Sequence, residues 1–300
     1  MTTALIFDPI YSQLELPAGH RFPVQKYQSL YNKLCSAGVG LSSFIKPEPI
    51  TIIEAKCHLD PQYIDDFAYG DLTAKAIRKI GFPWSEQLVK RTFTAVGGTI
   101  LAGEFSLRYG KAINLSGGYH HAFYDYGSGY CIVNDLYLSA VNLLNQHGIN
   151  RVLIFDCDVH QGDGTAQLAA HDSRIFTVSI HSARNFPFEK QRSDLDIELA
   201  DGIEDCAYLQ RVEEVLELAG KQFKPDAIIY DAGVDIHCDD ELGHLNISLH
   251  GVFQRDRLVF QYCRQHNIPV SAVIGGGYQR NIAQLVDVHF QLFRAALEWQ

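Results

Sequence analysis

The sequence lacks the features that mark membrane and secreted proteins. No apolar run reaches the roughly 18 residues of a bilayer span, and no charged and apolar leader with a small-residue cleavage site opens the chain. The seven cysteines form no CxxC pair and have no small-secreted-domain context, which indicates free thiols in a reducing compartment. We therefore expect no membrane span, no secretory signal and a cytoplasmic location.

Basic clusters, repeats and linkers are missing as well. A formal charge of −10 without a Lys/Arg cluster argues against direct nucleic-acid binding, and is compatible with a cationic partner such as a basic peptide or a polyamine. No repeat, low-complexity tract or Ser-, Gly- or Pro-rich segment divides the 300 residues, of which 47% are hydrophobic. We expect residues 1–300 to fold as a single domain with a large core. Nothing in the sequence specifies an oligomeric state.

Short apolar runs of β type alternate with longer helical patterns along the chain. The expected strands are residues 3–7, 50–54, 112–116, 151–156, 174–180, 226–233 and 269–277, and the expected helices lie near 24–36, 61–79, 85–109, 133–147, 203–222, 250–266 and 279–298. Continuous Val, Ile, Leu and Phe runs, rather than strict alternation, are typical of strands covered on both faces. The pattern predicts an α/β fold with an open, mostly parallel sheet flanked by helices on both faces.

The unusual polar residues all follow expected strands. The loops are "GGYHHAFYDYGSGYC" from residue 117, "DCDVHQGDG" from 156, "HSARNFPF" from 181, "GVDIHCDD" from 233 and "GGGY" from 275. In open parallel sheets the ligand crevice lies beyond the carboxyl ends of the strands. We therefore expect these five loops to converge on one rim and to form an active site there.

Two carboxylates and one imidazole in these loops suit a metal ion. Asp158 and His160 are separated by one residue, so in extended chain both side chains point the same way, and Asp235 arrives from another strand end. Two carboxylate oxygens and one imidazole nitrogen suit Zn²⁺, at roughly 2.0–2.2 Å, with one position left for water, which is the arrangement of a catalytic site. The alternative is a solvated loop after a strand.

The adjacent histidines 120 and 121 follow glycines at the same rim. A water activated by the metal needs a base, and the leaving group needs an acid, which imidazole supplies near neutral pH. Asp156 and Asp163 flank the ligands, and each is able to accept a hydrogen bond from one histidine and fix its tautomer. The alternative is that His120 and His121 are structural.

Aromatic residues in the remaining loops have two interpretations each. Tyr278 ends "VIGGGY", where the glycines let the phenol reach the metal and donate to the oxyanion of a tetrahedral intermediate; the alternative is an aromatic plug in a strand-to-helix turn. The run "GGGYQR" matches neither the dinucleotide fingerprint nor the P-loop. Tyr130 and Phe186 would face each other across a slot for a linear aliphatic chain, or serve in ordinary packing.

The motifs together resemble the zinc-dependent histone deacetylases and their bacterial relatives, which have the arginase–deacetylase fold. The resemblance covers about residues 3–297, and the motifs "GGYHHA", "GSGYCIVND", "DCDVHQGDG", "TVSIH", "DAGVDIHCDDELG" and "GGGY" occur in family order. Gln161, where many members have a second His, "VGGTILAG" at 96–103 and "DELGHLNIS" are most similar to the class IV branch.

The resemblance implies a role for each catalytic residue. Asp158, His160 and Asp235 would be the zinc ligands. His121 would be the general base, supported by Asp163, and His120 would act electrostatically or as a general acid, supported by Asp156. The phenol of Tyr278 would polarise the scissile carbonyl.

The resemblance also implies a substrate tunnel and a second cation. Tyr130 and Phe186 would be tunnel walls, with Gly129 near the substrate chain. A structural K⁺ would bind close to the zinc, through Asp156, Asp158 and His160, partly by backbone carbonyls, together with Ser179 and Ile180.

Three departures from the family pattern bear on the site. Cys157 stands where an aliphatic residue is usual, although alternation predicts that it points away from the metal. Gln161 removes one imidazole from the metal loop. Three glycines rather than four precede Tyr278, which leaves the reach of its phenol open.

The implied activity is hydrolysis of an N6-acyl-lysine, with acetyl as the simplest acyl group. One alternative keeps the chemistry and changes the substrate to acetylated polyamines or long fatty-acyl lysines. A second is an arginase-like hydrolase with two manganese ions, which would want a second acid two residues after the first, whereas this chain has Val234, Asp235 and then Asp239 and Asp240. A third is a non-catalytic protein that binds acylated ligands.

Overall fold

The computed structural model describes residues 3–298, which form an α/β structure built on one sheet. The sheet has eight strands in the order β2-β1-β3-β8-β7-β4-β5-β6, and every neighbouring pair is parallel. The strands are β1 (Ala4–Ile6), β2 (Phe44–Ile45), β3 (Lys111–Asn114), β4 (Val152–Asp156), β5 (Ile175–Ser182), β6 (Leu195–Leu199), β7 (Ala227–Asp231) and β8 (Val270–Val273). The predicted fold class is confirmed.

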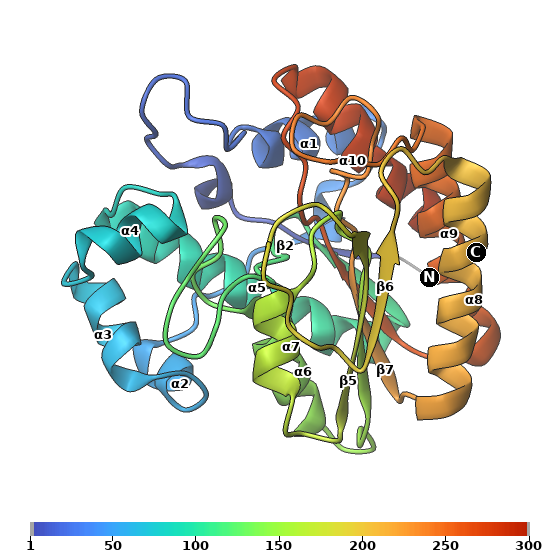
Figure 1. Ribbon diagram of the computed structural model, residues 1–300, viewed down its shortest axis with the longest axis horizontal. Helices are drawn as coiled ribbons and strands as arrows, with labels where there is room; N and C mark the ends of the chain where they lie inside the picture. The colour runs from blue at the N-terminus through green and yellow to red at the C-terminus, as the bar shows by residue number, and fades with distance from the viewer. Residues whose placement is uncertain (1–2, 299–300) are drawn as a thin grey trace.

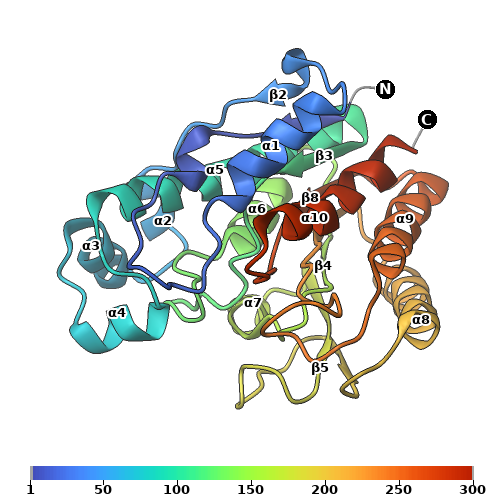
Figure 2. The ribbon, with the colours of Figure 1, turned by 90° about the horizontal axis from the view of Figure 1, so that it is seen from above.

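Helices lie on both faces of this sheet, as the sequence predicts. They are α1 (Lys26–Ser36), α2 (Ile52–Lys56), α3 (Pro61–Tyr69), α4 (Ala74–Ile80), α5 (Glu86–Tyr109), α6 (Asp135–Leu144), α7 (Asp163–Ala169), α8 (Asp205–Phe223), α9 (Leu249–His266) and α10 (Ile282–Leu297). Figure 1 shows the sheet between α6 and α7 on one side and α8 and α9 on the other. The short helices α2, α3 and α4 form a lobe beside the sheet, and Figure 2 shows α1 and α10 running alongside each other.

The central strands are buried because they are apolar along their whole length. All five residues of β4 and all five of β7 are buried, including the aspartates that end them. Phe155 of β4 and Tyr230 of β7 are register partners and pack with 6.4 Å between ring centroids. This continuous burial matches the pattern expected of a sheet covered on both faces.

The strand expected at 50–54 is wrong, because the local hydrogen bonding starts a helix there. Thr51 caps α2 with a capping box: its side chain accepts a hydrogen bond from the backbone N–H of Glu54, and the Glu54 carboxylate accepts from the backbone N–H of Thr51. Such a box satisfies donors that a helix start otherwise leaves open. The edge strand β2 lies earlier, at Phe44–Ile45, and is too short for a periodic signal.

The single helix expected at 61–79 is two helices. Gly70 takes a left-handed conformation with φ 85° and ends α3, and Thr73 caps α4 by accepting a hydrogen bond from the N–H of Ala76. The sequence analysis also missed α7, which begins inside the polar motif at Asp163, and β6, whose sequence "LDIEL" carries two acids. Both misses arise where polar residues break the apolar pattern that the prediction used.

Candidate metal centre and active site

The three predicted metal ligands lie together at the carboxyl ends of β4 and β7. The Nδ1 atom of His160 is 2.9 Å from Asp158 Oδ1 and 3.2 Å from Asp235 Oδ2, and all three side chains are buried. Their ligand atoms all lie within 4.8 Å of one another. Backbone N–H groups bind the carboxylate oxygens that face away from His160. The N–H of Gly276 donates to Asp158 Oδ2 at 2.8 Å, and that of Val159 donates to Asp235 Oδ1 at 3.0 Å.

The two carboxylates of Asp158 and Asp235 place negative charge in a buried site, which favours binding of a cation. Burial alone would lower the pKa of His160, but the hydrogen bonds and charges of Asp158 and Asp235 outweigh it and raise this pKa to about 10. Asp235 Oδ2 is buried and has no hydrogen bond of good geometry among residues 3–298, despite its closeness to His160. Once a metal ion displaces the proton of His160, two carboxylate oxygens and one imidazole nitrogen are the donor set of an open zinc site. The residues therefore fit a divalent metal ion.

The paired histidines lie next to this group, and each rests on its own carboxylate. Nδ1 of His120 lies 2.7 Å from Asp156 Oδ2, and Nδ1 of His121 lies 2.6 Å from Asp163 Oδ1. The two Nε2 atoms are 3.1 Å apart, and His120 Nε2 is 3.8 Å from Asp158 Oδ1. Each aspartate thus orients one imidazole so that its Nε2 faces the proposed metal position.

The two histidines are driven to opposite protonation states. Burial and the positive charge of His120 lower the pKa of His121 to about 4, although Asp163 acts in the other direction. Burial would also lower the pKa of His120, but the charges of Asp156 and Asp158 hold it well above its usual range. Since two imidazolium ions 3.1 Å apart repel each other, one ring is charged and the other is neutral. The neutral ring, His121, has a lone pair available for a proton.

Tyr278 reaches the same space despite the short glycine run before it. Its ring centroid lies 6.3 Å from that of His160 and 5.9 Å from that of Tyr130, and it lines the same cavity as His121. Burial and the charges of Asp158 and Asp235 raise the pKa of the phenol well above its usual value. The phenol is therefore a proton-bearing donor at neutral pH.

The site opens into a cavity of about 840 Å³, and the predicted tunnel residues line it. The rings of Phe186 and His121 meet edge to face, with 4.9 Å between centroids. Gly129 lies against both, because a Cβ on this residue would come within 2.8 Å of the His121 ring and 3.3 Å of the Phe186 ring. Gly129, Tyr130 and Phe186 thus lie where a chain leading to the metal site would pass.

Tyr130 has a backbone conformation that is rare for a residue with a side chain. Its φ of 67° lies in the left-handed region. Two hydrogen bonds hold the segment: the N–H of Tyr130 donates to Ile80 O at 2.8 Å, and the N–H of Gly129 donates to Lys79 O at 3.2 Å. The end of α4 therefore sets the position of this residue, which is predicted to be a tunnel wall, and holds it in a strained backbone conformation.

The residues expected around K⁺ lie beneath the paired histidines. Asp156 in β4 and Ser179 in β5 are register partners and both are buried, and Ile180 follows in the same strand. The Oγ atom of Ser179 lies 2.9 Å from His181 Nδ1. The structure brings these residues together, and their role with K⁺ stays a prediction.

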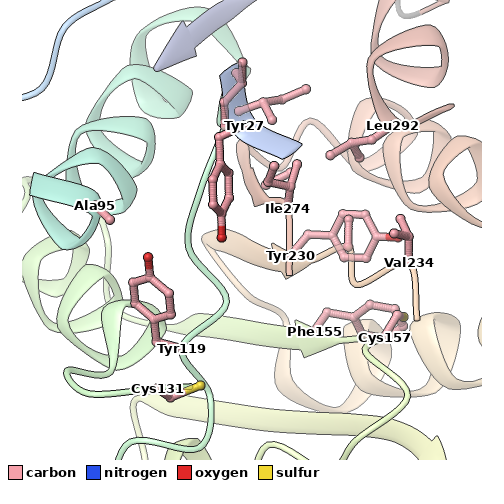
Figure 3. Packing of buried hydrophobic residues seen from close by; sticks show 14 of the residues in the cluster. Tyr27, Ala95, Tyr119, Cys131, Phe155, Cys157, Tyr230, Val234, Ile274 and Leu292 are labelled. Atoms are coloured by element: carbon pink, nitrogen blue, oxygen red, sulfur yellow. The ribbon is translucent and has the colours of Figure 1, made fainter. Parts of the chain in front are cut away.

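Two of the three departures prove harmless to the site. Cys157 points into the core, where Figure 3 shows it beside Phe155 and Tyr230, and burial raises the pKa of its thiol. Gln161 holds a neighbouring loop instead of a metal: its side-chain amide donates to Gln191 O and its carbonyl accepts from the N–H of Gln191.

Two residues outside the predicted set, Asp240 and Lys26, also shape the site. The Asp240 carboxylate accepts hydrogen bonds from the backbone N–H groups of Leu242, Gly243 and Tyr278, which fixes the last metal loop against the glycine turn. Lys26 is buried and donates to Gly275 O at 3.0 Å. Asp240 stands inside a recognised motif and was open to suspicion there, whereas Lys26 lies far away in the sequence, within an ordinary helical pattern.

Two further buried charges support the strand ends. Arg255 on α9 donates to Gly233 O and to Cys157 O, and pairs with Asp256 at 2.9 Å. Asp231 ends β7 beside Asp156 and forms a group with it and His120 whose oxygen and nitrogen atoms are close enough for a metal ion. Burial and the charge of Asp156 raise the pKa of Asp231 well above its usual range.

Within residues 3–298, no helix combines the length and the apolar character that crossing a bilayer requires.

Comparison with known proteins assigns the chain to a family. A family model described as "Histone deacetylase domain" matches residues 20–293. An uncharacterized protein of Picosynechococcus sp. is 46% identical over 299 residues, which is 97% of each chain. Histone deacetylase 2 of Arabidopsis thaliana is 34% identical over 70% of this chain and 53% of its own length. For histone deacetylase RPD3 of Saccharomyces cerevisiae the identity is 34%, over 63% of this chain and 46% of that protein.

The match therefore spans about half the length of these two named relatives. Among solved structures, the crystal structure of the HDA15 HD domain has a TM-score of 0.83 and 21% identity, and the match covers 98% of this chain and 91% of that one. This likeness shows the fold. The chain belongs to the histone deacetylase domain family and is a hydrolase of that family, with a buried group of Asp and His side chains consistent with a metal site.

Proposed function

We propose that this protein is a zinc-dependent lysine deacylase, which hydrolyses the amide bond between an acyl group and the N6 amine of lysine in a peptide or protein. One observation carries the proposal: the group Asp158, His160 and Asp235 lies against two histidines, each paired with its own carboxylate, at an aromatic-lined cavity. Metal ligands alone are found in many proteins, but one neutral and one protonated imidazole beside them provide both a base and an acid.

Asp158, His160 and Asp235 would hold the zinc ion. When bound, zinc supplies a Lewis acid that polarises the acyl carbonyl and lowers the pKa of water to about 7. A structural K⁺ would lie near Asp156, Ser179 and Ile180, where the register of β4 and β5 supports it. The binuclear manganese alternative is disfavoured, because it needs a second acid in the last metal loop. The Asp240 carboxylate in that loop already accepts hydrogen bonds from three backbone N–H groups.

The chain's own residues divide the proton transfers. His121 is neutral and takes the proton from the attacking water, while Asp163 fixes its tautomer through the 2.6 Å bond to Nδ1. His120 stays charged on Asp156, stabilises negative charge, and is placed to protonate the leaving amine. The phenol of Tyr278 keeps its proton and donates it in a hydrogen bond to the developing oxyanion.

The tunnel residues orient the substrate chain. Tyr130 and Phe186 would flank the lysine methylenes, and the missing side chain of Gly129 leaves room between them. The apolar walls also exclude water from the site, which strengthens the interactions of the charged groups at its base.

We further propose that residues 1–300 act as one catalytic domain in the cytoplasm, and that the chain is most similar to the class IV branch. The sheet takes strands from residue 4 to residue 273, which supports one cooperative unit. The seven free cysteines support a reducing compartment. Gln161 and the "DELGHLNIS" run support the branch.

The proposal is tested with purified protein whose metal content is measured. We expect one zinc per chain and hydrolysis of acetyl-lysine or long-acyl-lysine peptides, with acetylated polyamines assayed beside them as the alternative substrates. Loss of turnover with a chelator and recovery with Zn²⁺ would link the activity to the metal. A metal-loaded protein that hydrolyses none of these amides would overturn the proposal and favour an acyl-ligand-binding protein.

A further inference from the structure

The mouth of the cavity carries positive charge, in contrast to the chain as a whole. Arg78, Lys79 and Arg184 line this cavity and are exposed, whereas Glu189 is the one exposed acid among its lining residues within the described chain. Asp163 also lines the cavity, but it is buried and bound to His121. The whole sequence has a formal charge of −10. A cationic mouth on an acidic protein is a local feature that overall composition does not predict.

The fold places these cations at the entrance through α4. The carbonyls of Lys79 and Ile80 accept the hydrogen bonds from Gly129 and Tyr130 that hold the tunnel wall. Gly81 follows directly, and a Cβ there would come within 2.9 Å of the Tyr130 ring. Lys79 is therefore tied by its own backbone to the wall that a substrate would pass, and Arg78 directly precedes it on α4. Lys79 is held further, because its Nζ lies 3.4 Å from the centroid of the Tyr126 ring.

Two of the three cations at the mouth are not held in ion pairs within the described chain. Among residues 3–298, neither Arg78 nor Lys79 forms an ion pair. Arg184 Nη1 lies 3.3 Å from Asp201 Oδ2, and the Arg184 side chain is 79% exposed. Asp163 and, more weakly, Asp125 act on Lys79 in the attractive sense, and Lys75 on the same helix acts in the repulsive sense.

An exposed aromatic side chain lies at the same mouth. Phe188 lines the cavity beside Phe186 and is 90% exposed. A side chain of this size left in water marks a contact surface for a larger partner. A small free amine would reach the site without covering Phe188, whereas a polypeptide would run across it.

We propose that this mouth, defined by Arg78, Lys79, Arg184 and Phe188, selects acyl-lysines that lie in acidic stretches of polypeptide and disfavours acylated polyamines. The inference rests on the proposed deacylase function. When the acyl-lysine side chain enters the tunnel, the flanking residues of the peptide stay at the mouth, so Asp or Glu there meets the guanidinium and ammonium groups. The free ammonium groups of an acylated polyamine would meet like charge at the same place.

The test compares peptides that differ only in the charge of their flanks. We would measure kcat/KM for three acetyl-lysine peptides of equal length with Asp, Ser or Lys around the modified residue, and for an acetylated polyamine. The expected order is Asp, then Ser, then Lys, with roughly tenfold between the first and last at low salt and a smaller ratio near 0.5 M salt, because salt screens exposed charges. The acetylated polyamine should be the poorest substrate.

Charge reversal identifies the residues responsible. The double variant Arg78→Glu, Lys79→Glu should abolish or invert the preference for Asp over Lys flanks. The control is Arg211→Glu, Lys221→Glu, which makes the same change in net charge on α8, across the molecule from α4 in Figure 1, and should leave the preference unchanged. Anisotropy of labelled versions of the same peptides gives the preference as Kd, independently of turnover.

Each outcome decides one proposal. Equal kcat/KM and equal Kd for the three peptides, or an equal effect of the control variant, would overturn the role of the mouth. Efficient turnover of the acetylated polyamine would overturn it as well. Tighter binding of the Asp peptide without turnover of any peptide would support the mouth and overturn the deacylase proposal.

Discussion

At the scale of single residues, the proposed chemistry depends on two neighbouring histidines that differ in charge. His120 and His121 are adjacent in sequence and buried to a similar degree, yet the pKa of one is held high and that of the other is lowered. The difference comes from Asp156 and Asp158, which both act on His120, whereas His121 has one carboxylate and faces the charge of His120. The assignment of His121 as base and His120 as the charged partner follows from that asymmetry.

Tyr278 should act in the transition state, because its phenol keeps its proton and no described ligand contact to the metal group depends on it. We expect Tyr278→Phe to lower kcat by about 10²–10³ while the zinc content stays unchanged. Steady-state kinetics and metal analysis check this, with Tyr69→Phe, an exposed tyrosine on α3, as the control. A change confined to KM would remove the oxyanion role.

Asp235 should bind the metal directly, so its replacement has a different signature. We expect Asp235→Asn to reduce the zinc content as well as turnover, because the amide loses the negative charge that the cation needs. The matched control is Asp239→Asn, four residues along in the same loop, where the side chain is 66% exposed. Full zinc occupancy in Asp235→Asn would take this residue off the ligand set.

The sequence predicts the metal group of Asp158, His160 and Asp235 because the positions of these residues follow from strand geometry. Asp158 and His160 share a side through the alternation of extended chain, and Asp235 follows a strand whose end meets theirs. Lys26 and Arg255 obey no such rule: each is a charged residue on an amphipathic helix, where solvent exposure is the ordinary expectation. Only the tertiary structure buries them against the carbonyls of Gly275 and Gly233.

At the scale of elements, the strand ends are built so that backbone reaches the carboxylates. The turn after β8 comes so close to the metal group that a Cβ on Gly276 would lie 1.9 Å from Asp235 Oδ2 and 2.4 Å from Asp158 Oδ2. The same glycine donates its N–H to Asp158. The glycines of "GGGY" thus serve close approach to the metal group, and no phosphate is needed to explain them.

Gly276→Ala should therefore damage the metal site from the backbone side. We expect a loss of about 1–3 kcal/mol in the free energy of unfolding, as for other overpacked sites, together with lower zinc content. Thermal or denaturant unfolding and metal analysis measure both. Gly40→Ala is the control, because the nearest atom to its Cβ would be 3.8 Å away and its backbone is extended. Equal stability of the two variants would show that the turn yields freely.

Helices and strands with long apolar or amphipathic patterns were predictable from the sequence. Short elements whose type or ends depend on one or two polar contacts were not. The strands β4 and β7 and the helices α5 and α9 lie where their periodicity places them. In contrast, Thr51 and Glu54 turn an apolar run into α2 through a capping box, and Gly70 divides α3 from α4. These decisions depend on hydrogen bonds of one or two side chains, which hydrophobic periodicity does not register.

At the scale of the whole molecule, an acidic protein concentrates buried carboxylates at one edge of its sheet. Asp156, Asp158, Asp231 and Asp235 lie there without full compensation by basic side chains. Burying such charges is costly unless a cation or protons neutralise them. In the metal-free protein, protons fill this need: burial and the charge of Asp235 raise the pKa of Asp240 to about 7, and His160 keeps a pKa of about 10.

Metal removal should therefore matter more as the pH rises. Between about pH 4 and 7 the folded metal-free protein holds a proton on Asp240 that the unfolded chain has released, so its free energy of unfolding falls as pH increases. The contribution of His160 is full below its unfolded pKa and is lost as pH rises through about 10, which acts in the same direction. A bound cation replaces these protons, and its affinity rises with pH. We expect the difference in Tm between zinc-loaded and chelated protein to grow from pH 5 to 8, reaching roughly 5–10 °C when zinc far exceeds its Kd.

Calorimetry at several pH values, with and without chelator, measures this difference. In Asp235→Asn, whose metal site is weakened, the chelator should shift Tm little at any pH. A difference that stays constant or shrinks as pH rises would mean that protons do not compete with the metal at this edge of the sheet. The carboxylates would then be neutralised by some other means, and the argument that they exist to hold a cation would fail.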